Sequence, residues 1–137
     1  MRFLILFGLL VLCISSCRNA EEMEYEKYLV NGEMMYRQNC ANCHGIKGEG
    51  LKSLYPPLAN NKHLNDLENV VCVIKNGASG TIEVNGQTYD QAMPANLKIY
   101  DLDMAQLVTF LNKAFLEKEE IVKVDQVKII LENCESR

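Results

Sequence analysis

Cys40-Ala41-Asn42-Cys43-His44 decides the fold of this chain, because it places two thiols and an imidazole within five consecutive residues. Two cysteines with two residues between them serve in thiol–disulfide exchange, in zinc binding or in covalent attachment of a cofactor. A structural zinc site needs a second pair of ligands, and the sequence has no second C-x-x-C and no H-x-x-x-H. A redox dithiol belongs to a strand-turn-helix setting, which the residues around Cys40 do not indicate.

The adjacent histidine makes covalent haem the interpretation that fits these five residues best, since C-x-x-C-H is the attachment motif for haem c. Two intervening residues let one helical turn present both sulfurs to the vinyl groups of neighbouring pyrroles. The next residue then lies beneath the iron as an axial ligand. We therefore expect one haem c, bound covalently through Cys40 and Cys43, with His44 as a ligand of the iron.

The first sixteen residues have the pattern of an export signal. Met1-Arg2 is a short positive start, and residues 3–14 form an apolar run that is too short to span a bilayer comfortably. Ile14-Ser15-Ser16-Cys17 then resembles the lipobox of bacterial lipoproteins, which implies cleavage before Cys17 and lipidation of that cysteine. An ordinary secretory signal that is cut after Ser16 is the alternative. Both interpretations predict an exported protein of the periplasm or cell envelope, and the first also predicts a membrane anchor.

Export makes the cysteine count informative. Of six cysteines, one lies in the signal, one is the lipid site and two belong to the haem motif, which leaves Cys72 and Cys134. Two remaining thiols in an oxidising compartment predict one disulfide, and two separate buried thiols are the alternative.

Length and charge limit the remaining possibilities. The 137 residues, 48% of them hydrophobic, suffice for one domain with appendages. Removal of residues 1–16 leaves 13 basic and 18 acidic side chains, a net charge of −5, which argues against a nucleic-acid partner. The acidic surplus is uneven, because a basic cluster of Arg37, Lys47, Lys52 and Lys62 surrounds a single Glu49.

A helical pattern starts at residue 24 and leads into the haem motif, with Tyr25, Leu29, Gly32, Tyr36 and Cys40 three to four residues apart. Glycine inside a helix costs about 1 kcal/mol relative to alanine, so Gly32 predicts the close approach of another helix. A glycine, an aromatic four residues later and a haem cysteine four residues after that resemble the N-terminal helix of class I c-type cytochromes. The resemblance implies that Gly32 and Tyr36 pack against the C-terminal helix, and the hydroxyl of Tyr36 then needs water or a partner.

This resemblance covers residues 24–115 and implies further haem contacts. Pro56 stands where the family has a carbonyl that accepts a hydrogen bond from the proximal histidine, and Leu58 would pack on the haem. Met93-Pro94 occupies the place of the family's sixth ligand, so Met93 is the expected distal ligand of the iron. A methionine that fills core space is the alternative. His63 could also bind iron, but its position is typical of an exposed residue.

The pattern predicts the other elements as well. We expect a helix over residues 64–75 that ends at Asn76-Gly77, and a hairpin over residues 81–89 around Asn85-Gly86. Asp101 would cap the next helix, on which Phe110 faces the N-terminal helix.

The resemblance implies a mostly α class I cytochrome c fold, with a small hairpin before the distal ligand and an extra C-terminal helix. The domains are a signal at residues 1–16, a polar lipidated tether at 17–23, the cytochrome domain at 24–115 and an extension at 116–137, with Asp125 as the cap of its short helix. The implied function is one-electron transfer between exported or membrane redox partners, without catalysis. Alternatives are an electron-entry subunit of a dehydrogenase or oxidase complex, or a haem peroxidase or gas sensor.

Overall fold

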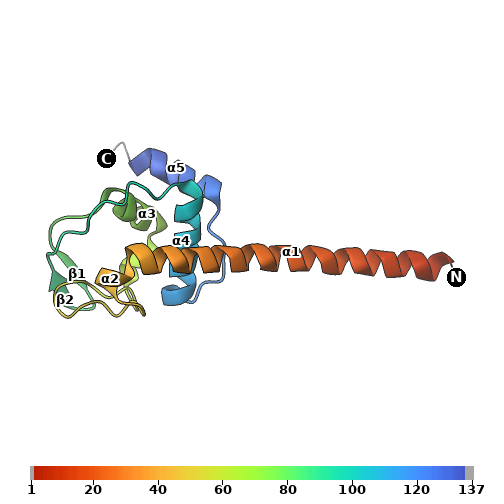
Figure 1. Ribbon diagram of the computed structural model, residues 1–137, viewed down its shortest axis with the longest axis horizontal. Helices are drawn as coiled ribbons and strands as arrows, with labels where there is room; N and C mark the ends of the chain where they lie inside the picture. The colour runs from red at the N-terminus through yellow and green to blue at the C-terminus, as the bar shows by residue number, and fades with distance from the viewer. Residues whose placement is uncertain (1, 135–137) are drawn as a thin grey trace.

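The computed structural model describes the backbone of residues 2–134 and the side chains of residues 20–134. The fold is mostly α with one small antiparallel hairpin, as the sequence predicts. In chain order the elements are α1 (Arg2–Asn39), α2 (Ala41–His44), the 3-10 helix η1 (Lys62–Asn65), α3 (Leu67–Asn76), β1 (Ile82–Val84), β2 (Gln87–Tyr89), α4 (Asp101–Leu116) and α5 (Val124–Cys134). Figure 1 shows the other elements gathered around the C-terminal part of α1, whose N-terminal part extends away from them.

The start of α1 differs from the prediction. Residues 18–23 were expected to form a polar tether without regular structure, and they are helical. No glycine or proline stands between Gly8 and Gly32, and Ala20, Glu21 and Glu22 are good helix formers, so nothing interrupts the helix. Within the part of the chain that the structure describes, no helix has both the length and the apolar character needed to cross a membrane.

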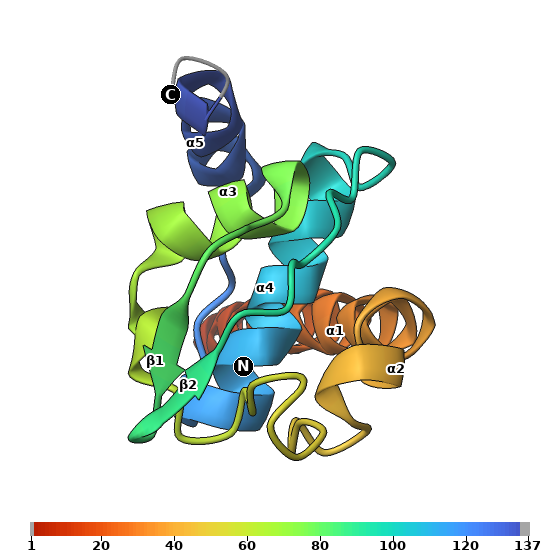
Figure 2. The same cartoon turned by 90° about the vertical axis from the view of Figure 1, so that its left-hand side faces the viewer.

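The core forms where α4 crosses the C-terminal half of α1 (Figures 1 and 2). A Cβ atom on Gly32 would lie 2.2 Å from the Gln106 carbonyl oxygen and 2.6 Å from Cβ of Phe110. One turn later the ring of Tyr36 is 1% exposed and packs against the rings of Phe110 and Phe115, at centroid distances of 5.5 and 5.6 Å. The predicted close approach of a second helix at Gly32 is therefore confirmed.

The hairpin agrees with the prediction. The strands β1 and β2 pair antiparallel, with Ile82 opposite Tyr89 and Val84 opposite Gln87. The turn residues Asn85 and Gly86 have φ of 53° and 79°, as a two-residue Asn-Gly turn requires.

Three helix starts differ from the prediction. The expected helix over residues 64–75 is two elements, η1 and α3, because the chain is extended at Asp66, whose side chain accepts the Asn69 N–H and caps α3. Asp101 is the first residue of α4 rather than its cap, a place that Tyr100 takes without a side-chain hydrogen bond. Asp125 likewise lies inside the first turn of α5. Both carboxylates still act favourably on the positive end of the helix dipole.

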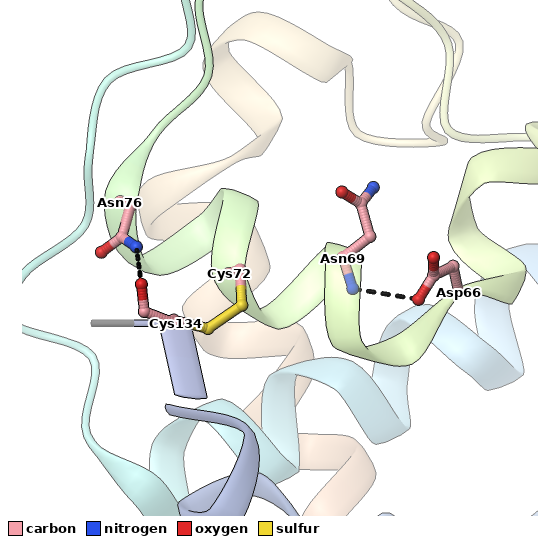
Figure 3. Close-up of a disulfide and its surroundings, with 5 residues drawn as sticks. All are labelled: Asp66, Asn69, Cys72, Asn76 and Cys134. Atoms are coloured by element: carbon pink, nitrogen blue, oxygen red, sulfur yellow. Dashed lines mark hydrogen bonds between the residues drawn. A yellow bond between two sulfur atoms is a disulfide. The ribbon is translucent and has the colours of Figure 1, made fainter. Parts of the chain in front are cut away.

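The C-terminal extension is part of the core. The Cys72 and Cys134 sulfurs form a disulfide that joins α3 to α5, with 5.4 Å between the Cα atoms (Figure 3). The Asn76 amide beside it donates a hydrogen bond to the Cys134 carbonyl, at 3.3 Å. Val127 of α5 is fully buried, and the Val122 N–H donates to the Thr109 hydroxyl of α4 at 3.0 Å.

Replacement of Gly32 by alanine tests the helix crossing. The added methyl group overlaps a backbone oxygen that cannot rotate away, so Gly32→Ala should lower the free energy of unfolding by about 1–3 kcal/mol. Denaturant unfolding of the haem-loaded protein measures the change. The matched control is Val30→Ala on the same helix, where the side chain is 64% exposed and the effect should be within about 0.5 kcal/mol. Equal stability of Gly32→Ala and the unchanged protein would contradict this packing.

Candidate haem site

The C-x-x-C-H motif forms one helical turn directly after α1. The N–H groups of Cys43 and His44 both donate to the Cys40 carbonyl, at 3.1 and 2.9 Å. Gly45, with φ of 82°, ends this turn. Both cysteines are half-buried free thiols on the same turn, the arrangement that attachment to two neighbouring pyrroles requires.

The surroundings of these thiols do not suit the two alternative uses of the motif. Burial, with the neighbouring Cys43 thiol as a second cause, raises the pKa of Cys40 to about 11. Thiol–disulfide exchange needs the opposite, a cysteine whose pKa is lowered toward neutrality. Across the described residues no three His, Cys, Asp or Glu side chains converge as metal ligands, so Cys40 and Cys43 have no partners for a zinc site.

The imidazole of His44 has one nitrogen engaged and one available. Its Nδ1 lies 2.9 Å from the Pro56 carbonyl oxygen, to which it donates a hydrogen bond. The loop between them closes because the Gly50 N–H donates to the His44 carbonyl at 2.7 Å, and because Gly50 has no Cβ to meet Tyr55. The Nε2 lone pair is then free for a metal, as is typical of metal-binding histidines.

Tyr36 supports the same turn from the core. Its hydroxyl donates a hydrogen bond to the Gly45 carbonyl at 2.5 Å, which supplies the partner that the sequence left open. Burial is the main reason that the pKa of Tyr36 rises to about 12, so the hydroxyl keeps its proton. The residue next to His44 is thus bonded directly to the helix that carries the haem cysteines.

Met93 is held through its backbone beside the end of α3. Its N–H and carbonyl exchange hydrogen bonds with Ala78, at 2.8 and 3.0 Å. Gly77 makes this approach possible, since a Cβ there would lie 2.5 Å from the Met93 oxygen. The roles of Gly77 and Ala78 were missed in the sequence, where Gly77 was only a signal for the end of a helix.

The structure brings most of the expected haem residues to one core. Cys40, Leu58 and Met93 are partly buried and pack against the same hydrophobic cluster. His63 is engaged elsewhere, because its Nε2 lies 3.0 Å from the Glu83 carbonyl of the hairpin. Cys17 lies in the helical backbone of α1, but its side chain is outside the described residues.

These residues fit a covalent haem. The two thiols share a helical turn, the imidazole has one nitrogen oriented by a carbonyl and the other available, and a thioether lies against the same core. Fold and site together define a small helical haem c protein.

Residues 29–115 match the family model described as "Cytochrome c", and the chain belongs to the cytochrome c family. It is similar to cytochrome c-552 of Thermus thermophilus, with 28% identity over 98 residues that cover 66% of this chain and 72% of the relative. It is also 28% identical over 98 residues to a second cytochrome c-552, from a particular strain of Thermus thermophilus, covering 66% of this chain and 64% of that relative. The protein is therefore an electron-carrier cytochrome with covalently bound haem c.

Proposed function

We propose that the protein carries single electrons between redox partners of the cell envelope while a lipid on Cys17 anchors it to a membrane. Cys40 and Cys43 hold the haem through thioether bonds, and His44 and Met93 are the axial ligands of its iron. When bound, the haem supplies a one-electron ferric/ferrous couple. The chain's own residues orient the ligands and keep the site closed.

The hydrogen bond between His44 and Pro56 is the observation that carries this proposal. At 2.9 Å it fixes the plane and the tautomer of the imidazole and strengthens Nε2 as a donor. Pro56 accepts through its backbone carbonyl, so the acceptor has no side-chain freedom of its own. A rigid proximal ligand suits electron transfer, because the site then changes little in geometry on reduction.

On the distal side, the thioether of Met93 is a soft, neutral donor that favours the ferrous state, so the reduction potential should exceed that of a bis-histidine haem. Peroxidase or gas-binding chemistry needs an open iron position, which a bound methionine denies. An electron-entry subunit of a larger complex uses the same haem site, and it is the second candidate for this reason.

Replacement of Met93 tests the closed site. Ferrous protein should resist carbon monoxide, whereas Met93→Ala should bind it readily and have a lower reduction potential, because the sixth position opens and a soft ligand is lost. Absorption spectra and redox titration of both proteins measure this. Met34→Ala, which removes a half-exposed methionine of α1, is the control and should behave like the unchanged protein. Rapid binding of carbon monoxide by the unchanged protein would refute the carrier and favour a sensor or an enzyme.

The docking surface for a redox partner is the loop that frames the haem motif, residues 45–58. Its side chains Ile46, Leu51 and Leu54 are 62, 47 and 48% exposed, an apolar area next to the exposed Lys47 and Lys52. Brief electron-transfer contacts are small, and complementary charge speeds and orients them. The partner should therefore present an acidic rim around an apolar centre.

Two members of the basic cluster need separate treatment. Arg37 forms an ion pair with Glu33 at 2.7 Å, so its charge is largely compensated locally. Lys62 is exposed at the start of η1 and remains a member of the cluster. The steering charge of this surface is thus carried by the three lysines rather than by Arg37.

Salt dependence of electron transfer tests this surface. The second-order rate constant with an acidic redox protein should fall as ionic strength rises, since screening weakens steering. Lys47→Gln combined with Lys52→Gln should reduce both the rate at low salt and its salt dependence, as stopped-flow kinetics can measure. Lys128→Gln on α5 removes an exposed charge elsewhere and serves as the control. A rate that does not change with salt would identify these lysines as solvated surface only.

The lipid anchor rests on the resemblance of Ile14-Ser15-Ser16-Cys17 to a lipobox. Because the residues that follow Cys17 are helical, the connection is stiffer than the flexible tether first expected. Eleven residues separate Cys17 from Tyr28, the first buried side chain, which corresponds to about 16 Å of helix. The anchor would thus hold the domain at a limited distance from the bilayer.

Cys17→Ser should release red, haem-loaded protein into the soluble fraction, because several acyl chains hold a protein at a membrane far more firmly than one. Fractionation of cells, followed by haem detection, measures the release. Cys13→Ser changes the other cysteine of the N-terminal segment and should leave the protein with the membrane. A Cys17→Ser protein that stays in the membrane fraction would show that the anchor lies elsewhere.

A further inference from the structure

The segment after Met93 is bonded to the last turn of α3 along its whole length. The bridge between Met93 and Ala78 begins this connection. Three residues further on, the Asn96 N–H donates to the Ile74 carbonyl at 3.0 Å. The expected ligand thus lies at one end of a segment that runs along a helix end.

Lys75 forms the rest of this connection with its side chain. Its Nζ donates hydrogen bonds to the carbonyls of Leu97 and Ile99, at 3.2 and 3.4 Å. It also lies 5.5 Å from the ring centroid of Tyr100, a cation–π contact with a ring that is 66% exposed. Among the described residues Lys75 forms no ion pair, so its charge serves the segment alone.

The helix that presents Lys75 is itself fixed from the opposite side. The disulfide at Cys72 and the hydrogen bond from Asn76 to the Cys134 carbonyl attach the same two turns of α3 to α5 (Figure 3). Lys75 lies between these two attachment points in the sequence. The end of α3 can therefore act as a rigid base on which the segment is held.

We propose that Lys75 is a positioning residue of the haem site, which holds residues 93–100 on α3 and so keeps Met93 at the iron. The proposal rests on the proposed function in one respect, that Met93 is the sixth ligand. Lys75 does not touch the iron ligand, since it acts on carbonyls that follow Met93 by four and six residues. Its loss frees the segment without removing the thioether.

The test compares Lys75→Met with Lys98→Met in the haem-loaded protein. Methionine keeps an unbranched apolar side chain and removes both hydrogen bonds and the charge. Lys98 is an exposed lysine of the same segment, so its replacement removes the same charge near the same site without loss of the clamp. Lys75→Arg, which retains a cationic donor, should restore the behaviour of the unchanged protein.

Two readouts separate the clamp from the ligand. Hydrogen exchange at the Met93 and Ala78 amides should be about tenfold faster in Lys75→Met, and unchanged in Lys98→Met. Binding of carbon monoxide to the ferrous protein should accelerate by a similar factor, because it requires the methionine to leave the iron. If Lys75→Met does not load haem, Lys75→Gln takes its place with the same expectations.

The outcomes are distinct. Unchanged amide exchange in the Lys75 variants would overturn the clamp, whatever binds the iron. Faster exchange with no change in carbon monoxide binding would overturn the role of Lys75 at the haem. Rapid carbon monoxide binding by the unchanged protein, with no further effect of Met93→Ala, would refute Met93 as the ligand while the exchange result still reports on the segment.

Discussion

The close contact of α1 with α4 at Gly32 is the constraint on which the haem site depends. A backbone carbonyl of α4 occupies the space that a side chain at position 32 would need. The two helices therefore pack at one register, and Tyr36 is enclosed by Phe110 and Phe115 one turn later. The tyrosine hydroxyl then bonds the residue after His44. A single helix crossing thus sets the place of the C-x-x-C-H turn relative to the core.

The features that could be predicted from the sequence are those with short-range causes. The C-x-x-C-H turn is consecutive in sequence, and the hairpin follows from Asn85-Gly86, which favours the two positive φ values that the turn needs. The helix starts were predicted less well. Asp101 and Asp125 suit a cap and a first turn about equally, and the register of packing decides between the two. The extent of α1 was underestimated because polar composition was given more weight than the absence of helix breakers.

Contacts between distant residues could not be predicted in this way. Lys75 reaches carbonyls 22 and 24 residues away, and a lysine at the end of a helix is usually an exposed, mobile side chain. The partner of Tyr36 lies nine residues away, across the haem turn, and it becomes evident only when the turn is placed. Both examples are side-chain donors to loop carbonyls, for which the sequence carries no periodic signal.

The C-terminal extension lies outside residues 29–115, yet it completes the core. Val122, Val127 and Cys134 are each at most 6% exposed. By the chain-entropy estimate, a cross-link between residues 62 positions apart contributes about 4 kcal/mol of stability. Because the cross-link is on α3, this stability is applied close to the segment that carries Met93.

X-ray absorption spectroscopy at the iron edge tests the central claim most directly, because it identifies the axial donors of the haem-loaded protein without a mutation. In both oxidation states the spectra should require one sulfur and one imidazole nitrogen in addition to the four pyrrole nitrogens. Spectra that fit a second nitrogen or an oxygen in place of sulfur, or a five-coordinate iron, would contradict the account.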